Sequence, residues 1–415
     1  METTIVSRLL SKLKNEYSEK QSLGSFIFNE LQFESILQLL PGKDDENCPA
    51  IYSTTLSVLY THKDIKHFIT NQFNLGEFNI QCNDRVGVIL PNGKELGLCL
   101  VATCSYCTCV PMNSSSTIDE IKHDIEILKV KALIVDTDLV NIEQLKSMIM
   151  ILKINKTADT LKLELVSDAG VAIHSSSKSV LNGPQDISLL LQTSGTTGQK
   201  KTVPYTLKTL MVGALCVAYS WRLTPTDCNL NMMPLFHVGG IVRNLLAPLL
   251  TGGSVILCSA FDPNLFWDIL QTPKCPVSWY YAVPTMHSAI LQIKELREAS
   301  GSNTNSHLRM ICNAGGGLLP SMAEQLQKAF TTVILPCYGM TECMPISCPS
   351  VDYKLNRRGT SGTACGPEIQ IFDDNKQLLT QSNQTGRICV RGPPLFDGYE
   401  NVPNSLTFTE DGWFD

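Results

Sequence analysis

The chain has 415 residues, with 33 Lys and Arg against 39 Asp and Glu and a formal net charge of −6. Its hydrophobic share of 43% excludes wholesale disorder, which requires few apolar residues and a high net charge. The mildly acidic balance argues against a nucleic-acid partner, because neutralising phosphates requires concentrated Lys and Arg. No apolar run reaches the roughly 18 residues that span a bilayer, so no membrane span is predicted.

Short apolar strands alternate with helical segments along most of the chain. In the first half, strands are expected at 84–90, 110–113 and 132–136, with helices at 96–104 and 118–128. Further strands are expected at 187–192, 228–234, 254–257, 277–282, 308–312 and 332–336, with helices at 207–219, 241–250, 285–298 and 321–330. Because strand, helix, strand successions give parallel pairing, the sequence predicts an α/β fold of two layered subdomains with mainly parallel sheets.

From about residue 350 the pattern changes to short extended pieces, such as 370–373 and 386–393, separated by turn residues. This pattern of short extended pieces and turns predicts a small β-rich subdomain. The polar segments 173–186 and 299–307 are expected to be linkers or loops. We expect an N-terminal extension with the first helices over 1–49, then one large domain over 50–415 with subdomains of about 50–185, 186–345 and 346–415.

The 16 cysteines are scattered without paired spacing, and the first ten residues lack the apolar run of a signal peptide. Reduced thiols and a cytoplasmic location are therefore expected. Cys99, Cys104, Cys107 and Cys109 lie close in sequence, but no matching CxxC pair or histidine stands beside them. They are predicted to be buried thiols rather than zinc ligands.

The strongest local pattern follows the strand at 187–192. There hydroxyl residues and glycines lead to two lysines and a run expected to form a helix: Thr193, Ser194, Gly195, Thr196, Thr197, Gly198, Gln199, Lys200 and Lys201. Glycines let backbone N–H groups approach an anion, hydroxyls add donors, and lysine adds a positive charge. The spacing is not that of a Walker A motif. The pattern predicts a phosphate-binding loop, with a flexible linker of the same composition as the alternative.

This loop resembles the phosphate loop of the adenylate-forming (AMP-binding) superfamily, which includes the acyl-CoA synthetases. Other segments resemble that family's motifs in the same order: 234–240 its acyl-pocket motif, 313–317 its adenine wall, 338–342 its YGxTE motif and 362–367 its glycine-proline loop. Segments 386–393, 398–399 and 411–414 continue the series. The resemblance covers about residues 50–415 and implies the family's large N-terminal domain.

The resemblance also implies a reaction, in which a small carboxylic acid and ATP form an acyl-adenylate and pyrophosphate, and coenzyme A then accepts the acyl group. It implies four groups of site residues. Thr193 to Gly198 and Lys201 would bind the ATP phosphates, and Thr341, Glu342 and Lys201 would be catalytic, with Glu342 as the Mg²⁺ ligand. Adenine or AMP would lie against Gly315, Gly316, Gly317, Tyr338 and Gly339, and the acyl group against His237, Val238, Gly239 and Arg243.

Two of these residues allow a second interpretation. His237 is not needed as a base, because a carboxylic acid is already ionised at neutral pH; it would border the acyl pocket or be an ordinary core histidine. Arg243 would either pair with a second carboxylate on the substrate or be structural. The chain also departs from the family pattern, since Lys200 and Thr202 replace the proline and glycine around Lys201, and Arg387 replaces a glutamate.

Two alternative functions stay open at this stage: an adenylation domain that loads a carrier protein in a multidomain synthetase, and a nucleotide-binding module without turnover. In the family, the segment that 411–414 resembles continues into a ribose-binding aspartate and a small C-terminal domain. We therefore expect that domain to be absent and this chain alone to be weakly active or inactive. A peroxisomal location stays open for the same reason.

Overall fold

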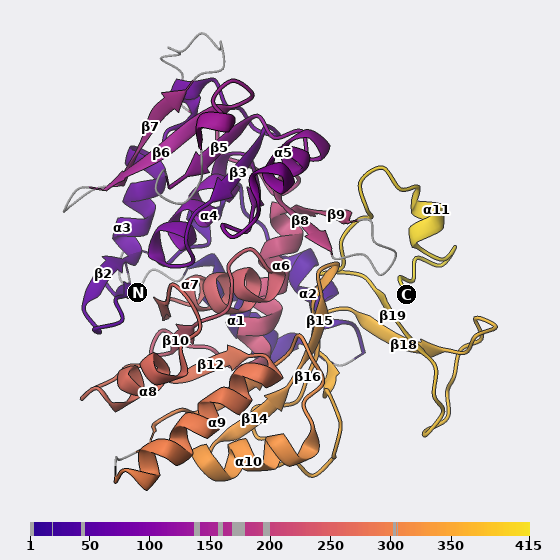
Figure 1. The fold of residues 1–415 in the computed structure, drawn as a ribbon. Coiled ribbons are helices and arrows are strands. Elements are labelled where there is room, and N and C mark those ends of the chain that lie inside the picture. The colour runs from indigo at the N-terminus through magenta and orange to yellow at the C-terminus, as the bar shows by residue number, and fades with distance from the viewer. Residues whose placement is uncertain are drawn as a thin grey trace.

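The first sheet contains seven strands in the order β7-β6-β5-β3-β4-β8-β9 (Figure 1). The computed structural model describes residues 4–18, 20–42, 46–136, 142–156, 161–167, 179–193, 200–301, 304 and 306–415. The strands of this sheet are β3 Arg85–Ile89, β4 Thr108–Pro111, β5 Ala132–Val135, β6 Met150–Lys156, β7 Leu161–Ser167, β8 Ile187–Thr193 and β9 Lys201–Thr206. The inner strands run parallel, whereas β7 and β9 pair antiparallel at the two edges.

The second sheet also contains seven strands, in the order β14-β13-β12-β10-β11-β1-β2. Its strands are β1 Pro49–Tyr52, β2 Val58–Thr61, β10 Cys228–Asn231, β11 Ser254–Leu257, β12 Trp279–Ala282, β13 Met310–Asn313 and β14 Val333–Pro336. All neighbours are parallel except β1 and β2. The predicted α/β fold with mainly parallel sheets is confirmed. Each sheet also contains strands that are distant in sequence from its other strands. In the first sheet these are β8 and β9, and in the second they are β1 and β2.

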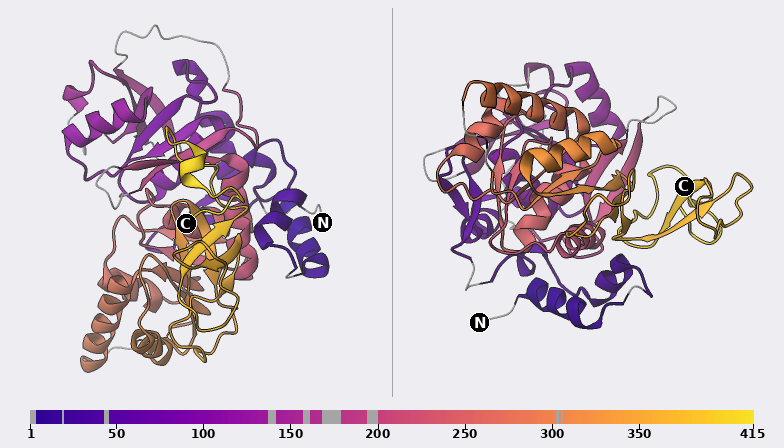
Figure 2. Two further views of the ribbon diagram at one scale, coloured as in Figure 1. Left: turned by 90° about the vertical axis from the view of Figure 1, so that its right-hand side faces the viewer. Right: turned by 90° about the horizontal axis from the view of Figure 1, so that it is seen from below.

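Helices fill the space between the sheets and cover their outer faces (Figures 1 and 2). Between the sheets lie α4 Lys94–Tyr106, α6 Leu207–Ser220, the π-helical segment η5 Gly239–Leu246 and α7 Ala247–Leu250. α4 packs tightly on the second sheet at Gly97, where an added Cβ would lie 2.6 Å from a methyl carbon of Leu257. The remaining main helices are α5 Ile118–Ile127, α8 Pro263–Gln271, α9 Pro284–Ala299 and α10 Pro320–Phe330.

Smaller elements complete the chain at both ends. At the N-terminus α1 Ile5–Glu16 and α2 Leu23–Glu30 begin at the capping side chains of Thr4 and Ser22, and α3 His62–His67 follows β2. Short turns of helix lie at η1 Ile36–Gln38, η2 Phe68–Gln72, η3 Leu75–Phe78 and η4 Ile142–Gln144. At the C-terminus are β15 Tyr338–Met340, β16 Cys343–Cys348, β17 Thr363–Ala364, β18 Glu368–Phe372, β19 Arg387–Arg391 and α11 Asn404–Thr407. The strands β15, β16 and β17 form one small antiparallel sheet, and β18 and β19 form another. These sheets confirm the predicted β-rich part.

The structure corrects the expectations at three places. The run after Lys201 was expected to lead directly into a helix, but 201–206 form β9, whose buried Val203 and Tyr205 pair with β8. The hairpin of β6 and β7 was not predicted. The helix expected at 241–250 begins as the π-helical η5 and continues as α7, with Pro248 in its first turn. Parts of the predicted linkers, 173–178, 302–303 and 305, lie outside the described residues.

The cysteines agree with the prediction of reduced thiols. All 16 are free, and Cys99, Cys104, Cys107 and Cys109 are buried. Burial raises the pKa of Cys107 and Cys109 well above the ordinary value of a thiol, so both stay protonated at neutral pH. None of the helices in the described part of the chain combines the length and apolar character that crossing a bilayer requires.

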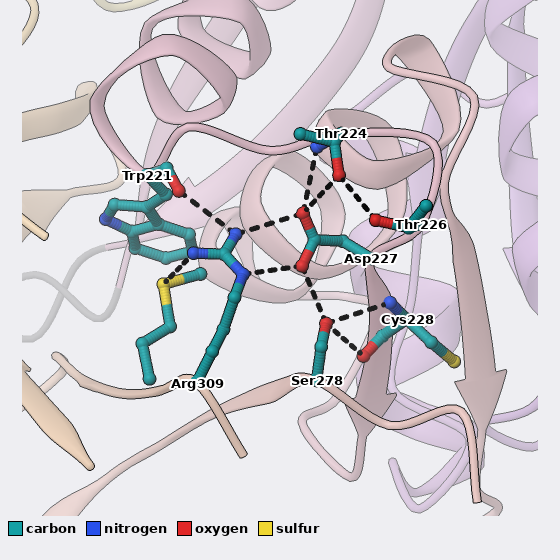
Figure 3. Close-up of polar contacts among 8 residues, drawn as sticks. Trp221, Thr224, Thr226, Asp227, Cys228, Ser278 and Arg309 are labelled. Atoms are coloured by element: carbon teal, nitrogen blue, oxygen red, sulfur yellow. Dashed lines mark hydrogen bonds and ion pairs between the residues drawn. The ribbon is translucent and has the colours of Figure 1, made fainter. Parts of the chain in front are cut away.

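A half-buried ion pair joins the amino ends of three strands of the second sheet (Figure 3). Arg309, just before β13, donates from Nε and Nη2 to the two carboxylate oxygens of Asp227, just before β10, at 2.6 and 3.1 Å. Ser278, just before β12, donates to Asp227 Oδ1 at 2.7 Å, and the backbone N–H of Thr224 donates to Oδ2 at 2.9 Å. Burial alone would raise the pKa of Asp227, but these donors hold it below its usual value.

We predict that Asp227→Asn lowers the free energy of unfolding by about 2–3 kcal/mol at neutral pH, because it removes a charged partner from several donors at once. Since the folded-state pKa of Asp227 is lowered, its contribution is present above about pH 4 and is lost as the pH falls through that lowered value. Urea unfolding of both proteins at several pH values measures this.

The matched control is Arg358→Met, because Arg358 pairs with Glu324 between side chains that are both exposed. That pair should contribute less than about 1 kcal/mol. Equal stability changes in the two variants would contradict a specific role for the Asp227 cluster.

Candidate active site

Tyr281, near the carboxyl end of β12, brings two of the predicted motifs together. Its hydroxyl lies 2.9 Å from the position a Cβ would take on Gly239 and 3.8 Å from the same position on Gly315. Gly239 lies in the acyl-pocket motif after β10, and Gly315 in the adenine-wall loop after β13. Because β10, β12 and β13 are parallel, their carboxyl ends meet at one edge of the sheet. Sequence reasoning did not single out Tyr281; its position at a strand end, just before Val283 and Pro284, was the available signal.

The acyl-pocket motif forms a tight turn tied to the first sheet. The side chain of Asn92, in the loop after β3, accepts from the Leu235 backbone N–H at 3.0 Å and donates to the Met233 carbonyl at 3.2 Å. Val238 is buried, whereas His237 is exposed and its ring contacts that of Phe236 at 4.6 Å. Partial desolvation lowers the pKa of His237, so the ring is neutral at pH 7.

The predicted adenine wall is a loop with all three glycines exposed, Gly315, Gly316 and Gly317. The Asn313 side chain at the end of β13 donates to the Gly316 carbonyl at 2.9 Å and holds the loop against the strand end. Gly315 has a φ of +75°, a conformation that glycine adopts without strain. The loop therefore presents backbone rather than side chains at this edge.

Glu342 lies at the turn between β15 and β16 and is held on both sides. It is only 9% exposed, and its Oε1 accepts a hydrogen bond from the Tyr399 hydroxyl. Its carbonyl accepts from the Phe396 backbone N–H at 2.9 Å. The carbonyl of the preceding Thr341 accepts from the hydroxyl of Tyr205 on β9 at 2.5 Å. Burial and the Glu342 carboxylate both raise the pKa of Tyr399, so this phenol stays a donor at neutral pH.

The two adjacent lysines have different surroundings. Lys200 Nζ lies 3.1 Å from both carboxylate oxygens of Asp124 on α5. Lys201 Nζ instead lies 4.7 Å from the ring centroid of Tyr399, the residue that contacts Glu342. Lys201 also pairs with Thr193 across β8 and β9, at the base of the predicted phosphate loop. Ser194, Gly195, Thr196, Thr197 and Gly198 lie outside the described residues.

Arg243 contacts both the YGxTE segment and the Tyr281 ring. Arg243 lies on η5 and is fully buried, and its Nη2 donates to the carbonyl of Tyr338 at 3.2 Å. The Tyr338 side chain is 37% exposed. A Cβ on Gly339 would lie 3.3 Å from Nη2 of Arg243 and 2.8 Å from Sδ of Met344, so a larger residue there would require the Met344 side chain to shift.

The carboxylate of Glu342 suits a metal cation that is also bound by phosphate oxygens of a substrate. Across the described residues, no group of three or more His, Cys, Asp or Glu side chains could form a metal site. Mg²⁺, however, is commonly held by one or two carboxylates together with waters and substrate phosphates. Glu342, with Oε2 free of the Tyr399 hydrogen bond and Lys201 nearby, fits that mode of binding.

The comparisons with known proteins identify the family of the chain. Residues 74–400 match the family model described as AMP-binding enzyme, and the chain therefore belongs to this family. It is 31% identical over 354 residues to the oxalate–CoA ligase of Arabidopsis thaliana, covering 82% of this chain and 67% of the relative. It is 34% identical over 228 residues to the oxalate–CoA ligase of Saccharomyces cerevisiae, covering 54% of this chain and 40% of that relative.

Solved structures show the same fold. The crystal structure of ATP-bound MatB from Rhodopseudomonas palustris superposes with a TM-score of 0.77 over 92% of this chain and 75% of that one, at 23% identity. The resemblance inferred from the motifs is thus confirmed for family and fold. The aligned residues span two thirds of the Arabidopsis relative and less than half of the yeast relative.

The turn of the acyl-pocket motif yields a prediction about Gly240. A Cβ at this position would lie 2.3 Å from the Pro234 carbonyl oxygen, which belongs to the backbone and cannot rotate away. We expect Gly240→Ala to lower the free energy of unfolding by about 1–3 kcal/mol. Gly317→Ala is the control, because no atom lies within 4 Å of that position, and it should change stability by less than about 0.5 kcal/mol. Thermal unfolding of both variants tests this, and a Gly240→Ala protein as stable as wild type would contradict it.

Proposed function

We propose that the protein activates a small carboxylic acid with ATP, releasing pyrophosphate, and transfers the acyl group from the adenylate to coenzyme A. The observation that carries this is the arrangement of Glu342, Tyr399 and Lys201, which come from three distant segments and meet beside the turn that contains Thr341. The CoA-ligase names of the two relatives above support coenzyme A as the acceptor.

Charge repulsion is the main obstacle to this reaction. The attacking carboxylate and the α-phosphate of ATP are both anionic, so the site must neutralise charge where the two meet. Lys201 provides a positive charge at the base of the predicted phosphate loop, and the loop from Thr193 to Gly198 would provide backbone and hydroxyl donors. When bound through Glu342 and the phosphates, Mg²⁺ would supply further charge neutralisation.

The neighbouring groups would position the reactants. Thr341, at the turn before Glu342, would hydrogen-bond the α-phosphate and the acyl carboxylate. Adenine would lie between the exposed backbone of Gly315 to Gly317 and the half-exposed ring of Tyr338, next to Gly339. His237, Val238, Gly239 and Arg243 would border the acyl group, and no proton transfer is asked of His237, since the acid is ionised at neutral pH.

The direct test is a screen of carboxylic acids against the complete natural protein with ATP and Mg²⁺. We expect pyrophosphate release that depends on the acid, and an acyl-CoA product identified by mass spectrometry when coenzyme A is present. Acid-dependent pyrophosphate release without acyl-CoA would refute coenzyme A as the acceptor and favour a carrier protein. ATP binding without pyrophosphate release from any acid would refute the enzyme function.

The adjacent lysines allow a matched comparison at the proposed site. Lys201→Ala and Glu342→Ala should each reduce adenylation by about 100-fold or more, because each removes a charge at the reacting phosphates. Lys200→Ala should leave most activity, because Lys200 pairs with Asp124 on α5 instead. Circular dichroism and thermal unfolding verify that all three variants are folded. Equal losses in Lys200→Ala and Lys201→Ala would contradict the assignment of Lys201.

A further inference from the structure

Tyr399 contacts two charged residues of the proposed site with different parts of its side chain. The Lys201 ammonium lies over the face of the ring, with Nζ 4.7 Å from the ring centroid. The hydroxyl of Tyr399 donates a hydrogen bond to Oε1 of Glu342. Glu342 is only 9% exposed, and a buried carboxylate needs such a donor to offset the loss of water.

Lys201 and Glu342 carry opposite charges, but they are not paired with each other. Among the described residues neither side chain forms an ion pair, whereas the adjacent Lys200 pairs with Asp124. A direct ion pair would occupy the ammonium that the ATP phosphates require and the carboxylate that a metal ion requires. The single hydrogen bond from a neutral phenol instead leaves the other carboxylate oxygen of Glu342 with its acceptor capacity unused.

A cluster of aromatic rings fixes the Tyr399 ring in place. Phe396 packs edge-on against it with 4.8 Å between the ring centroids, and Phe414 does so at 6.1 Å. Phe408 contacts both Phe396 and Phe414 and completes the cluster. Side chains that are locked by packing in this way can hold a neighbouring functional group in one geometry. Phe414 belongs to the last of the motifs found in the sequence, so that motif reaches the proposed site through Tyr399.

The backbone around Tyr399 is tied to the two segments that the side chain bridges. The N–H of Phe396 donates to the carbonyl of Glu342 at 2.9 Å. On the other side, the N–H of Glu400 donates to the carbonyl of Thr202 on β9 at 3.1 Å. Tyr399 is therefore held between β9 and the turn that joins β15 to β16.

We propose that Tyr399 is a positioning residue of the adenylation site, and that it keeps Lys201 and Glu342 from pairing with each other. This inference rests on the proposed function. The ammonium can leave a weak cation–π contact for a phosphate of ATP, and the free oxygen of Glu342 stays available to a metal ion. Tyr399 acts through these two residues and has no contact with the substrate. Burial and the Glu342 carboxylate both raise the pKa of Tyr399, which keeps its hydroxyl a donor at neutral pH.

The role of the hydroxyl is tested with Tyr399→Phe in the complete natural protein, because phenylalanine keeps the ring and its packing. Mn²⁺ serves as the probe, since it accepts the same oxygen ligands as Mg²⁺. Its binding in the presence of ATP, without any acid, is followed by electron paramagnetic resonance. We expect the variant to bind Mn²⁺ about 10-fold more weakly or worse, as is typical when a group that orients a metal-binding residue is lost.

The outcomes separate this inference from the proposed function. Unchanged Mn²⁺ affinity in Tyr399→Phe, with binding lost in Glu342→Ala, would overturn the inference and leave the proposed function intact. Mn²⁺ binding that survives Glu342→Ala would overturn the metal-binding role of Glu342, and the inference with it. If wild type releases no pyrophosphate with any acid, the proposed function fails and the inference fails with it.

A double substitution distinguishes positioning from a purely structural role. If Tyr399 acts through Glu342, Tyr399→Phe should cause no further loss of Mn²⁺ affinity in a Glu342→Gln protein, because the two changes remove the same interaction. A structural tyrosine would weaken binding by the same factor in both backgrounds, and that result would contradict the inference.

The role of the ring is tested with Tyr399→Leu. Without the ring, the ammonium of Lys201 is free to pair with Glu342, so KM for ATP at saturating Mg²⁺ should rise by about 10-fold, since a charge-assisted contact to phosphate is lost. Tyr399→Phe, which keeps the ring, should leave this KM as in wild type. The same KM for ATP in both variants would overturn the separation of the two charges by the ring. If Tyr399→Leu does not fold, Tyr399→Met takes its place, because methionine fills irregular gaps.

The matched control is Tyr106→Phe. Tyr106, at the end of α4, is another buried tyrosine whose hydroxyl has a protein partner, the carbonyl of Ile69 at 2.7 Å. Its loss should lower stability while Mn²⁺ affinity and KM for ATP stay as in wild type. A loss of Mn²⁺ affinity in Tyr106→Phe as large as in Tyr399→Phe would overturn the assignment of Tyr399.

Discussion

The parallel pairing of β10, β12 and β13 is the constraint on which the rest of the site depends. Parallel strands bring their carboxyl ends to one edge, so three segments distant in sequence leave the sheet side by side. The Asp227 cluster joins the amino ends of the same strands through side chains of Arg309 and Ser278. The Asp227 cluster, which stabilises the fold, and the proposed reaction site thus lie at opposite ends of the same three strands. Polar groups at the carboxyl ends therefore do not have to hold the strands together.

A second set of contacts joins the small β-rich part to the first large sheet. Tyr399 contacts Glu342 and Lys201, and the Glu400 backbone N–H donates to the Thr202 carbonyl on β9 at 3.1 Å. The Glu400 side chain forms an ion pair with Arg85 at the start of β3. Glu342 and Lys201 are thus held by residues that have no proposed contact with substrate. Their orientation depends on packing across the whole domain rather than on the local turn.

Local patterns were enough to predict the parallel strands, and the family resemblance gave the order of the motifs. Lys201 and Glu342 as site residues stay predictions. Local patterns could not show that Tyr399 contacts Glu342 or that Tyr281 lies between Gly239 and Gly315, because those contacts join segments far apart in sequence. The hairpin of β6 and β7 had a readable signal, since Leu161, Leu163 and Leu165 alternate with charged residues. Arg243 shows the limit most clearly: the sequence allowed two interpretations, and it could not show that the side chain is fully buried and bonded to the Tyr338 carbonyl.

The ion pair between Arg85 and Glu400 spans 315 positions of the sequence. Contacts of such long range form late in folding, because a large loop must close before they contribute any stabilisation. During synthesis from the N-terminus, both large sheets can assemble before Tyr399 and Glu400 leave the ribosome. Glu342 and Lys201 would then acquire their final orientation in the last step, so that the proposed site is completed after the bulk of the domain has folded.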